Sequence, residues 1–424
     1  MTATTNAPST VTGVLGGRWR ADVTASGDVL PWDGSPPLMW HVAADDRWHT
    51  PSAEPSVRQV LLDGTPVVET RLRIPNGDAV QRVWSVADQG GLTVIEVEND
   101  SPLPIAVAFT RRDLLSVRPP TDMPLEGIEL PAGSVAFPVG HHSTITVALA
   151  HDGRGAGTLP AGLAPALQVA RGWMAMCDRA GRFVLPDDVL VAAATTARCA
   201  LALGGPGDPD DDPAAFLLGV GQLVRMGEEA EPWLPDVAHA AERVARAARR
   251  GGDWLTGATL DAASAAFDAA GDRRAAGDLA AMRARLTIDP ALPPDPPDGI
   301  TGVAWLERRL ADPAGHLFPA GIPAPWLGAT VETYGLQVGN GATVSFALRW
   351  HGARPAILWE VVGASVTLTA PVVAPGWSSS SASGEALWPP PPGAELLETG
   401  SLDTLDLPAT DLHRPLPEDG TSFS

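Results

Sequence analysis

The residue pair whose chemistry best suits a sugar is Asp253-Trp254. An indole face can stack on the apolar face of a sugar ring, and a neighbouring carboxylate accepts hydrogen bonds from hydroxyl groups. Hydrolysis of a glycosidic bond needs two carboxyl groups about 5–10 Å apart, one protonated and one ionised. We therefore take Asp253 as a candidate catalytic residue and Trp254 as a candidate substrate-binding residue. The alternative is a solvated loop carboxylate beside a core tryptophan.

A second aromatic and polar segment lies near the N-terminus. Trp40 and Trp48 stand close to His41, Arg47 and His49. Tryptophan combines a large apolar ring with one hydrogen-bond donor, which suits a sugar-binding or interdomain loop. Trp40 and Trp48 are thus further candidate substrate-binding residues. The alternative is the edge of a strand with ordinary core tryptophans.

Other chemistry is poorly represented in the sequence. Acidic residues cluster at 208–212 and 228–231, where they also suit helix starts. His141-His142 is an adjacent pair, so its side chains do not share a helix face, and neither HExxH nor CxxC occurs. The phosphate-binding and esterase signatures GxxxxGK[ST], GxGxxG and GxSxG are also missing. We expect neither a metal ion nor a cofactor.

The composition limits the partners and the compartment. The chain has 424 residues and a formal charge of −21, which disfavours nucleic acid and anionic membrane surfaces. Its cysteines, Cys177 and Cys199, are predicted to be buried thiols in a reducing compartment. The first residues lack a basic and an apolar signal region, and no apolar run is long enough to span a bilayer. We therefore expect a cytoplasmic protein.

The N-terminal part has the pattern of an antiparallel β-sandwich, expected over residues 10–155. Asp-Gly, Asn-Gly and Gly-Gly pairs supply the positive φ angles that tight hairpin turns need. They separate short alternating segments, which predicts consecutive hairpins. The expected strands are residues 57–62, 67–74, 80–86, 92–97 and 105–109.

The middle of the chain, residues 165–290, is predicted to be an Ala-rich region of antiparallel helices. Asp212-Pro213 is a strong start signal because Asp caps the helix and Pro tolerates the first helical position. Gly227 is the matching stop signal. The expected helices are residues 189–203, 213–226, 232–250, 259–270 and 272–286.

A Pro-rich linker at 290–297 leads to a predicted short helix and a small antiparallel β-domain over residues 298–376. The helix is expected at 302–310 and the strands at 331–336, 343–350, 356–362 and 365–369. Residues 377–424 are rich in Ser, Pro and acidic residues, which predicts a tail that adds little to stability. The fold class is thus α+β with several domains.

Two segments carry a family resemblance. Residues 95–109 and 343–360 resemble the sandwich and C-terminal β-domain of glycoside-active proteins of the glucoamylase and disaccharide-phosphorylase type. The resemblance implies a sandwich, an (α/α)-toroid and a C-terminal β-domain, with glycoside hydrolase activity. The helical length available here is roughly half of what six helix pairs need.

Two functional hypotheses follow. The first is a carbohydrate-associated protein with glycoside-hydrolase-like architecture, catalytically active or degenerate, that binds an oligosaccharide. The second is a non-enzymatic scaffold whose Ala-rich helices bind a protein partner. A concave cleft lined by carboxylates and Trp at the helical region favours the first, and inner helix ends with only Ala, Leu and Gly favour the second.

Overall fold

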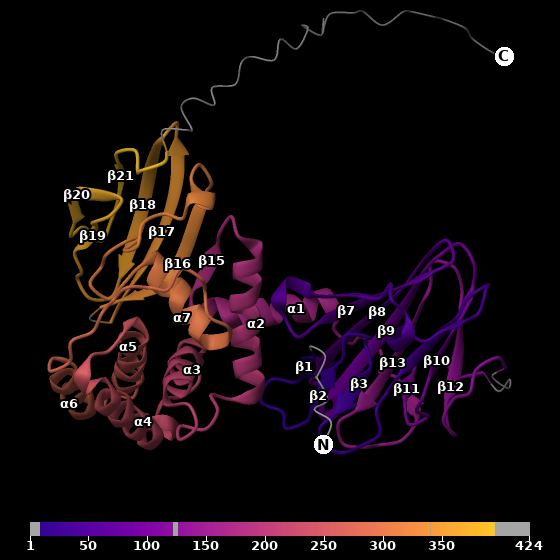
Figure 1. Ribbon diagram of the computed structural model, residues 1–424. Helices are drawn as coiled ribbons and strands as arrows, with labels where there is room; N and C mark the ends of the chain where they lie inside the picture. Colours follow the sequence, from indigo (N-terminus) through magenta and orange to yellow (C-terminus); the bar gives the residue numbers. More distant parts are fainter. Residues whose placement is uncertain (1–8, 122–125, 340, 395–424) are drawn as a thin grey trace, which may run out of the picture.

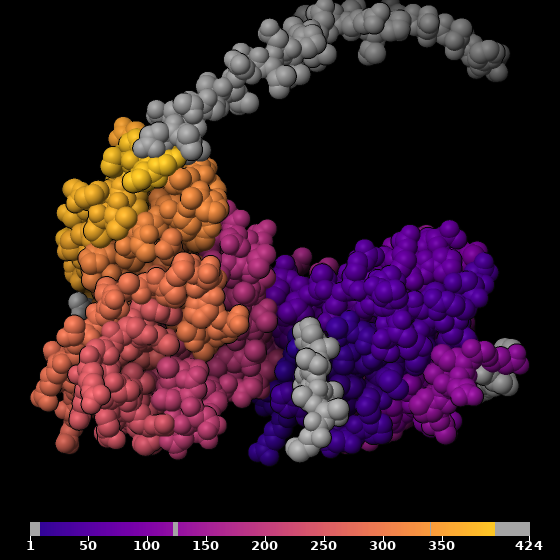
Figure 2. Space-filling view, viewed as in Figure 1, coloured from indigo at the N-terminus to yellow at the C-terminus, as the bar shows by residue number. Residues whose placement is uncertain are grey.

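The computed structural model describes residues 9–121, 126–339 and 341–394. Antiparallel sheets, then helices, then another antiparallel sheet follow one another along the chain, which confirms the α+β fold class. Two lobes result, an N-terminal β-lobe and a second lobe in which the helices lie against the C-terminal sheet (Figure 1). The space-filling view shows a hollow between the N-terminal lobe and the C-terminal sheet (Figure 2). No described helix is long and apolar enough to cross a membrane.

The N-terminal lobe is a sandwich of two main sheets with a small third one. The larger sheet has the order β14-β11-β13-β9-β8-β7-β6, the facing sheet β12-β10-β4-β5, and the small sheet β1-β2-β3. The strands are β1 (Thr10–Gly13), β2 (Arg20–Val23), β3 (Val29–Pro31), β4 (Trp40–Ala43), β5 (Trp48–His49), β6 (Arg58–Leu61), β7 (Val68–Ile74), β8 (Gly77–Val86), β9 (Leu92–Asp100), β10 (Ile105–Phe109), β11 (Leu115–Ser116), β12 (Val135–Val139), β13 (Thr144–Ala150) and β14 (Gly157–Thr158).

The core of the sandwich explains why apolar and polar residues alternate along these strands. Side chains from both main sheets meet in one apolar cluster, among them Leu72, Ile95, Phe109 and Phe137. Burying a side chain of this size stabilises the fold by roughly 1.5–3 kcal/mol relative to exposing it. The opposite face of the larger sheet packs against helix α1 (Ala166–Cys177), through residues that include Trp84 and Ala170.

The predicted hairpins are confirmed from β6 to β9 and wrong at the next step. β6, β7, β8 and β9 pair with their chain neighbours in antiparallel register. β10 instead pairs with β4 and β12 in the facing sheet. Asn99 marks the crossing: its side-chain amide donates to the carbonyl of Leu103 at 2.8 Å and to that of Gly140 at 3.1 Å. These bonds fix the crossing segment instead of a hairpin turn.

The helical region contains the predicted helices and one more. Helix α1 was not expected from the sequence, and helix α5 begins at Trp254 instead of 259 because Asp253 caps it. Helix α3 has the predicted bounds, with Asp212 as its N-cap and Gly227 in a left-handed conformation after its end. The helices that follow α1 are α2 (Asp188–Gly204), α3 (Pro213–Met226), α4 (Leu234–Ala247), α5 (Trp254–Ala269) and α6 (Arg273–Arg283), and α7 (Gly299–Leu310) is the short helix predicted after the Pro-rich linker.

The C-terminal sheet has the order β15-β16-β17-β18-β21, with a separate pair β19-β20. In β17, Val344, Phe346 and Leu348 are buried on one face, as their alternation predicts, and α7 packs on the same core. β15 lies within the expected helical region but pairs with β16. The strands are β15 (Arg182–Val184), β16 (Val331–Val338), β17 (Ala342–His351), β18 (Arg354–Val362), β19 (Leu368–Ala370), β20 (Ala374–Ser379) and β21 (Ser383–Leu387).

The predicted start of the tail at residue 377 is wrong. Residues 377–388 contain the end of β20 and all of β21, which pairs with β18. Trp388 follows β21 and is 1% exposed in the C-terminal core. Residues 378–384 are five Ser, one Ala and one Gly, and they show no apolar periodicity, so the sequence pattern missed this edge strand. Residues 395–424 of the expected tail lie outside the described part of the chain.

The two lobes touch where the turn between β6 and β7 meets α2. Gly64 has φ +72°, and its carbonyl accepts a hydrogen bond from Thr196 Oγ1 at 2.9 Å. A Cβ atom at Gly64 would overlap the carbonyl group of Ala192 in α2. This turn therefore needs glycine both for its backbone conformation and for the close approach of the helix.

Gly64→Ala is expected to lower the free energy of unfolding by about 2–4 kcal/mol, because left-handed strain adds to overpacking. The matched control is Gly90→Ala, since Gly90 has φ +86° with nothing within 4 Å of a Cβ atom. That control should lose only the left-handed cost of about 1–2 kcal/mol. Urea denaturation of both variants measures the difference, and equal losses would show that α2 does not pack against this turn.

Candidate functional site

Asp253 and Trp254 are neighbours in sequence, but their side chains line different pockets. The Asp253 carboxylate is exposed and accepts hydrogen bonds from the backbone N–H of Thr256 at 2.9 Å and from its hydroxyl at 3.0 Å. Asp253 is thus the N-cap of α5. Trp254 is half-buried and lines a pocket of 450 Å³, whereas Asp253 lines a different, shallower hollow beside Arg243.

The second candidate segment is mostly built into the sandwich. Trp40 is 1% exposed, and its indole N–H donates to the carbonyl of Ser26 at 2.9 Å. Its ring is enclosed by the core and presents no face to a ligand. Trp48 is half-buried and donates to the carbonyl of Glu126 at 2.8 Å. The nearby His49 is held between the carboxylates of Asp46 and Glu54.

The Trp254 pocket lies between α5, the end of α6 and the segment that follows α7. Asp312 Oδ2 lies 2.8 Å from His316 Nδ1, and Asp312 Oδ1 accepts the backbone N–H of His316 at 3.0 Å. Asp312 thereby fixes the imidazole and leaves Nε2 as the ring nitrogen for another partner. The pocket combines one indole and several prolines with a polar set that comprises Arg283, Asp289, Arg308, Asp312 and His316.

A smaller pocket of 240 Å³ adjoins it and shares Arg308 and Pro313 with it. This second pocket lies between α3, α5, α7 and the hairpin of β16 and β17. We call the two adjoining pockets the helix–sheet groove. The polar residues of the smaller pocket are Gln222, Arg225, Asp261, Ser264, Asp268, Glu307, Arg308, Gln337 and Thr343.

Asp261 links three of the helices that border the groove, α5, α6 and α7. Its carboxylate forms ion pairs with Arg283 of α6 and Arg308 of α7, while Asp261 itself belongs to α5. Burial lowers the pKa of both guanidinium groups from their ordinary value. The pair of arginines therefore depends on this carboxylate for compensation of buried charge.

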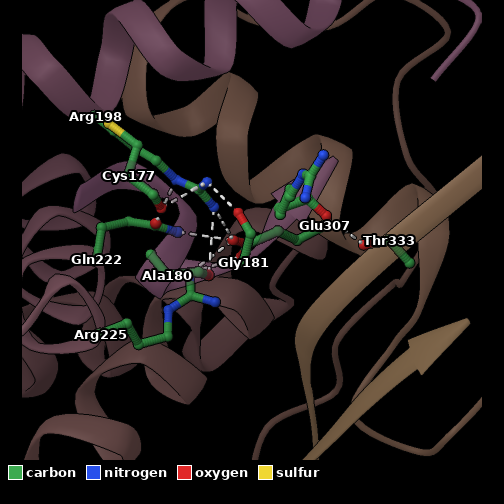
Figure 3. Close-up of polar contacts among 9 residues, drawn as sticks. Cys177, Ala180, Gly181, Arg198, Gln222, Arg225, Glu307 and Thr333 are labelled. Carbon is green, nitrogen blue, oxygen red and sulfur yellow. Dashed lines mark hydrogen bonds and ion pairs between the residues drawn. The ribbon is translucent and has the colours of Figure 1, made fainter. Parts of the chain in front are cut away.

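A buried polar cluster forms the rear of the smaller pocket (Figure 3). Arg198 is 2% exposed and donates to Gln222 Oε1 at 3.0 Å, to Glu307 Oε1 at 3.2 Å and to the carbonyl of Gly181 at 2.5 Å. Arg225 Nη2 binds both Glu307 oxygens, at 2.7 and 2.9 Å. Gln222 Nε2 donates to Glu307 Oε1 at 2.9 Å. One carboxylate thus joins α2, α3 and α7.

The charge state of Glu307 follows from these contacts. Burial is the largest influence and favours the neutral acid, but Arg225, Arg198 and Gln222 together outweigh it. The pKa of Glu307 is therefore held below its ordinary value. A general acid in glycoside hydrolysis needs the opposite shift, a raised pKa. Glu307 is consequently a hydrogen-bond acceptor and not a proton donor at neutral pH.

Arg225 leaves one donor unused among the described residues. Its Nη1 is buried and has no hydrogen-bond partner there, although Arg225 lines the smaller pocket. An unsatisfied buried donor costs about 1–3 kcal/mol. An oxygen atom of a bound molecule could accept this bond.

Sequence reasoning missed the groove residues other than Trp254. Glu307 and Arg308 are part of an amphipathic helix, where charged residues usually face solvent. Asp312 and His316 lie in a loop, and no motif distinguishes them. The described residues contain no group of three or more His, Cys, Asp or Glu placed to hold a metal ion. Comparison with family models, with curated proteins and with solved structures finds no match to this chain.

Proposed function

We propose that this protein binds a neutral oligosaccharide in the helix–sheet groove and does not cleave it. The observation that carries the proposal is the half-buried indole of Trp254 in the wall of a 450 Å³ pocket that also contains Arg283, Asp312 and His316. Sugar sites pair an aromatic ring for the apolar ring face with charged side chains for the hydroxyl groups.

The polar lining suits hydroxyl groups, which both donate and accept hydrogen bonds. Carboxylates such as Asp289 and Asp312 accept, and guanidinium groups such as Arg283 and Arg308 donate. Among the described residues of the groove, five carboxylates face three guanidinium groups. This excess of negative charge disfavours anionic ligands and favours a neutral polyol.

Binding without cleavage is supported by the contacts of two groove carboxylates, Glu307 and Asp261, and by the position of Asp253. Hydrolysis requires one carboxyl group that keeps its proton near neutral pH. Glu307 is held ionised by two arginines and Gln222, and Asp261 is bound by two more arginines. Asp253, the candidate catalytic residue of the sequence, caps α5 and does not line the groove.

The scaffold hypothesis has less support. It requires inner helix ends that carry only small and apolar residues, which would offer a protein partner an apolar surface. The helix ends that border the groove instead carry carboxylates, guanidinium groups and Trp254. The groove therefore supports the carbohydrate hypothesis over the scaffold hypothesis.

The experiment is a panel of neutral oligosaccharides screened against the wild-type protein, followed by calorimetric titration of the tightest ligand. Trp254→Ala should weaken binding roughly fivefold to tenfold, because stacking on an indole contributes about 1 kcal/mol or somewhat more. Two matched controls should bind normally. Trp32→Ala removes a tryptophan that is 56% exposed in the N-terminal lobe, and Asp253→Asn keeps a good N-cap residue.

Incubation of the wild-type protein with the same ligand should release no new reducing ends. If no member of the panel binds, the carbohydrate proposal is wrong. If binding occurs and Trp254→Ala leaves it unchanged, the groove is not the binding site. Turnover that Asp253→Asn abolishes would restore Asp253 as a catalytic residue.

A further inference from the structure

The two cysteines of the chain lie side by side at the junction of the lobes. Cys177 is the last residue of α1, and Cys199 lies in α2, 22 residues later. Their Sγ atoms are 3.5 Å apart, and each residue is 2% exposed. These are the only cysteines among the 424 residues.

Contact between the two cysteines of a chain is uncommon by chance. A buried residue touches about 6–12 others, so two cysteines placed at random in 424 positions would meet in only a few per cent of chains. Packing alone does not require sulfur at both positions, because small apolar residues fill similar space. The adjacency therefore points to chemistry between the two thiols.

The surroundings give the two thiols different roles. A hydrogen bond from the Cys199 thiol, followed by the positive charge of Arg198, lowers the pKa of Cys177 from its ordinary value, although burial opposes this. The same hydrogen bond, together with burial, raises the pKa of Cys199. Cys177 is thus the better nucleophile, and Cys199 keeps its proton until a later step.

We propose that Cys177 and Cys199 form a modification site at which a peroxide converts the thiol pair to a disulfide. The Cys177 thiolate attacks one peroxide oxygen, the O–O bond breaks, and a sulfenic acid and hydroxide form; the hydroxide takes up a proton to give water. Cys199 sulfur then attacks Cys177 sulfur, forming the S–S bond and releasing a second water with the sulfenic oxygen and the Cys199 proton. The two sulfurs lose two electrons, and the peroxide gains them.

The geometry favours this route over others. The Sγ atoms need to approach by about 1.5 Å to reach the length of a disulfide bond, a small movement for two side chains on neighbouring helices. Both thiols are 2% exposed, so bulky thiol reagents are excluded, whereas an oxidant as small as hydrogen peroxide needs only a small opening to reach them. Because the second thiol is already in contact, the sulfenic acid is resolved within the same molecule.

The thiol pair is also connected to the helix–sheet groove through Arg198. Arg198 precedes Cys199 in α2, and its Nη1 lies 3.3 Å from the carbonyl oxygen of Cys177. The same guanidinium group binds Glu307 in the wall of the groove. One buried side chain thus connects the thiol pair to a residue that lines the groove.

The test treats the full-length protein with hydrogen peroxide and then alkylates it under denaturing conditions. The expected result is an intact-mass loss of two hydrogen atoms, no alkylated cysteine, and a Cys177–Cys199 peptide that dithiothreitol separates. The melting temperature should rise by about 3 °C, as for a cross-link that closes a loop of this length in a chain of 424 residues.

Cys199→Ala serves as the control, because it leaves Cys177 without a resolving thiol. In this variant, peroxide should add oxygen to Cys177, detected by a sulfenic-acid probe, and the melting temperature should not rise. Two results would overturn the proposal. One is a wild-type protein whose two thiols stay alkylatable after prolonged peroxide treatment; the other is sulfinic or sulfonic acid on Cys177 with Cys199 still free.

Discussion

Glu307→Gln is expected to lower the free energy of unfolding by about 3–5 kcal/mol, the cost of breaking a buried ion pair from one side. The substitution preserves size but leaves the positive charges of Arg198 and Arg225 without a counter-charge. Arg198 is 2% exposed, so water cannot replace the lost carboxylate without opening the junction of α2, α3 and α7. Urea denaturation at pH 7 measures the loss.

The control for this prediction is Glu332→Gln. Glu332 pairs with Arg349 at 3.2 Å, but the Arg349 side chain is 64% exposed, so the expected loss is at most about 1 kcal/mol. A loss for Glu307→Gln as small as that of the control would mean that the buried cluster does not hold these helices together.

Lowering the pH should also lower the free energy of unfolding of the wild-type protein. The folded-state pKa of Glu307 lies below its ordinary value because its arginine partners outweigh burial. Its contribution to stability is therefore complete above the unfolded value of about 4.3 and is lost as the pH falls through the folded value. Glu307→Gln should lack this component, so the stability difference between wild type and variant should shrink on acidification.

Ending the chain at residue 377 is expected to unfold the C-terminal sheet. The truncation removes β21, which pairs with β18, and it removes Trp388, which is 1% exposed. The Trp388 ring lies 5.2 Å from that of Trp377, which in turn lies 5.3 Å from that of Trp359. Loss of a buried tryptophan alone costs about 3–5 kcal/mol, and the strand adds its ladder of hydrogen bonds.

Ending the chain at residue 394 is the matched control, because it keeps every described C-terminal residue. Thermal denaturation followed by near-ultraviolet circular dichroism compares the two proteins. The shorter one should lose the part of the tryptophan signal that comes from the C-terminal sheet and melt at least several degrees lower. Equal melting curves would show that β21 and Trp388 do not belong to the folded core.

The sequence predicted the elements that local chemistry determines. Helix α3 has the predicted bounds because Asp212, Pro213 and Gly227 mark its ends. The strands β7 to β9 follow from alternation and from turn residues such as Asn76, which has φ 61°. The missed elements lack such signals: α1 has no side-chain cap, and β21 is an edge strand of mixed small and polar residues.

The site was less predictable than the fold. Trp254 could be chosen from the sequence because an Asp-Trp pair suits sugars. The other residues of the groove come from distant segments. Only the tertiary fold brings Asp261, Glu307 and His316 to one groove. Asp253 shows why a residue type alone can mislead: the carboxylate that suggested catalysis in the sequence is the N-cap of a helix in the structure. The type of a residue limits the reactions and contacts that it can make, and its packing in the fold decides which of these it does make.

The central claim is that Trp254 contacts the ligand, and the indole N–H resonances of ¹⁵N-labelled protein test it most directly. Titration with the tightest oligosaccharide of the panel should shift the resonance that disappears in Trp254→Ala. The resonances of Trp40, buried in the sandwich, and Trp32, exposed in the N-terminal lobe, should stay in place. A shift of the Trp48 resonance with an unmoved Trp254 resonance would contradict the account and place the ligand on the N-terminal lobe.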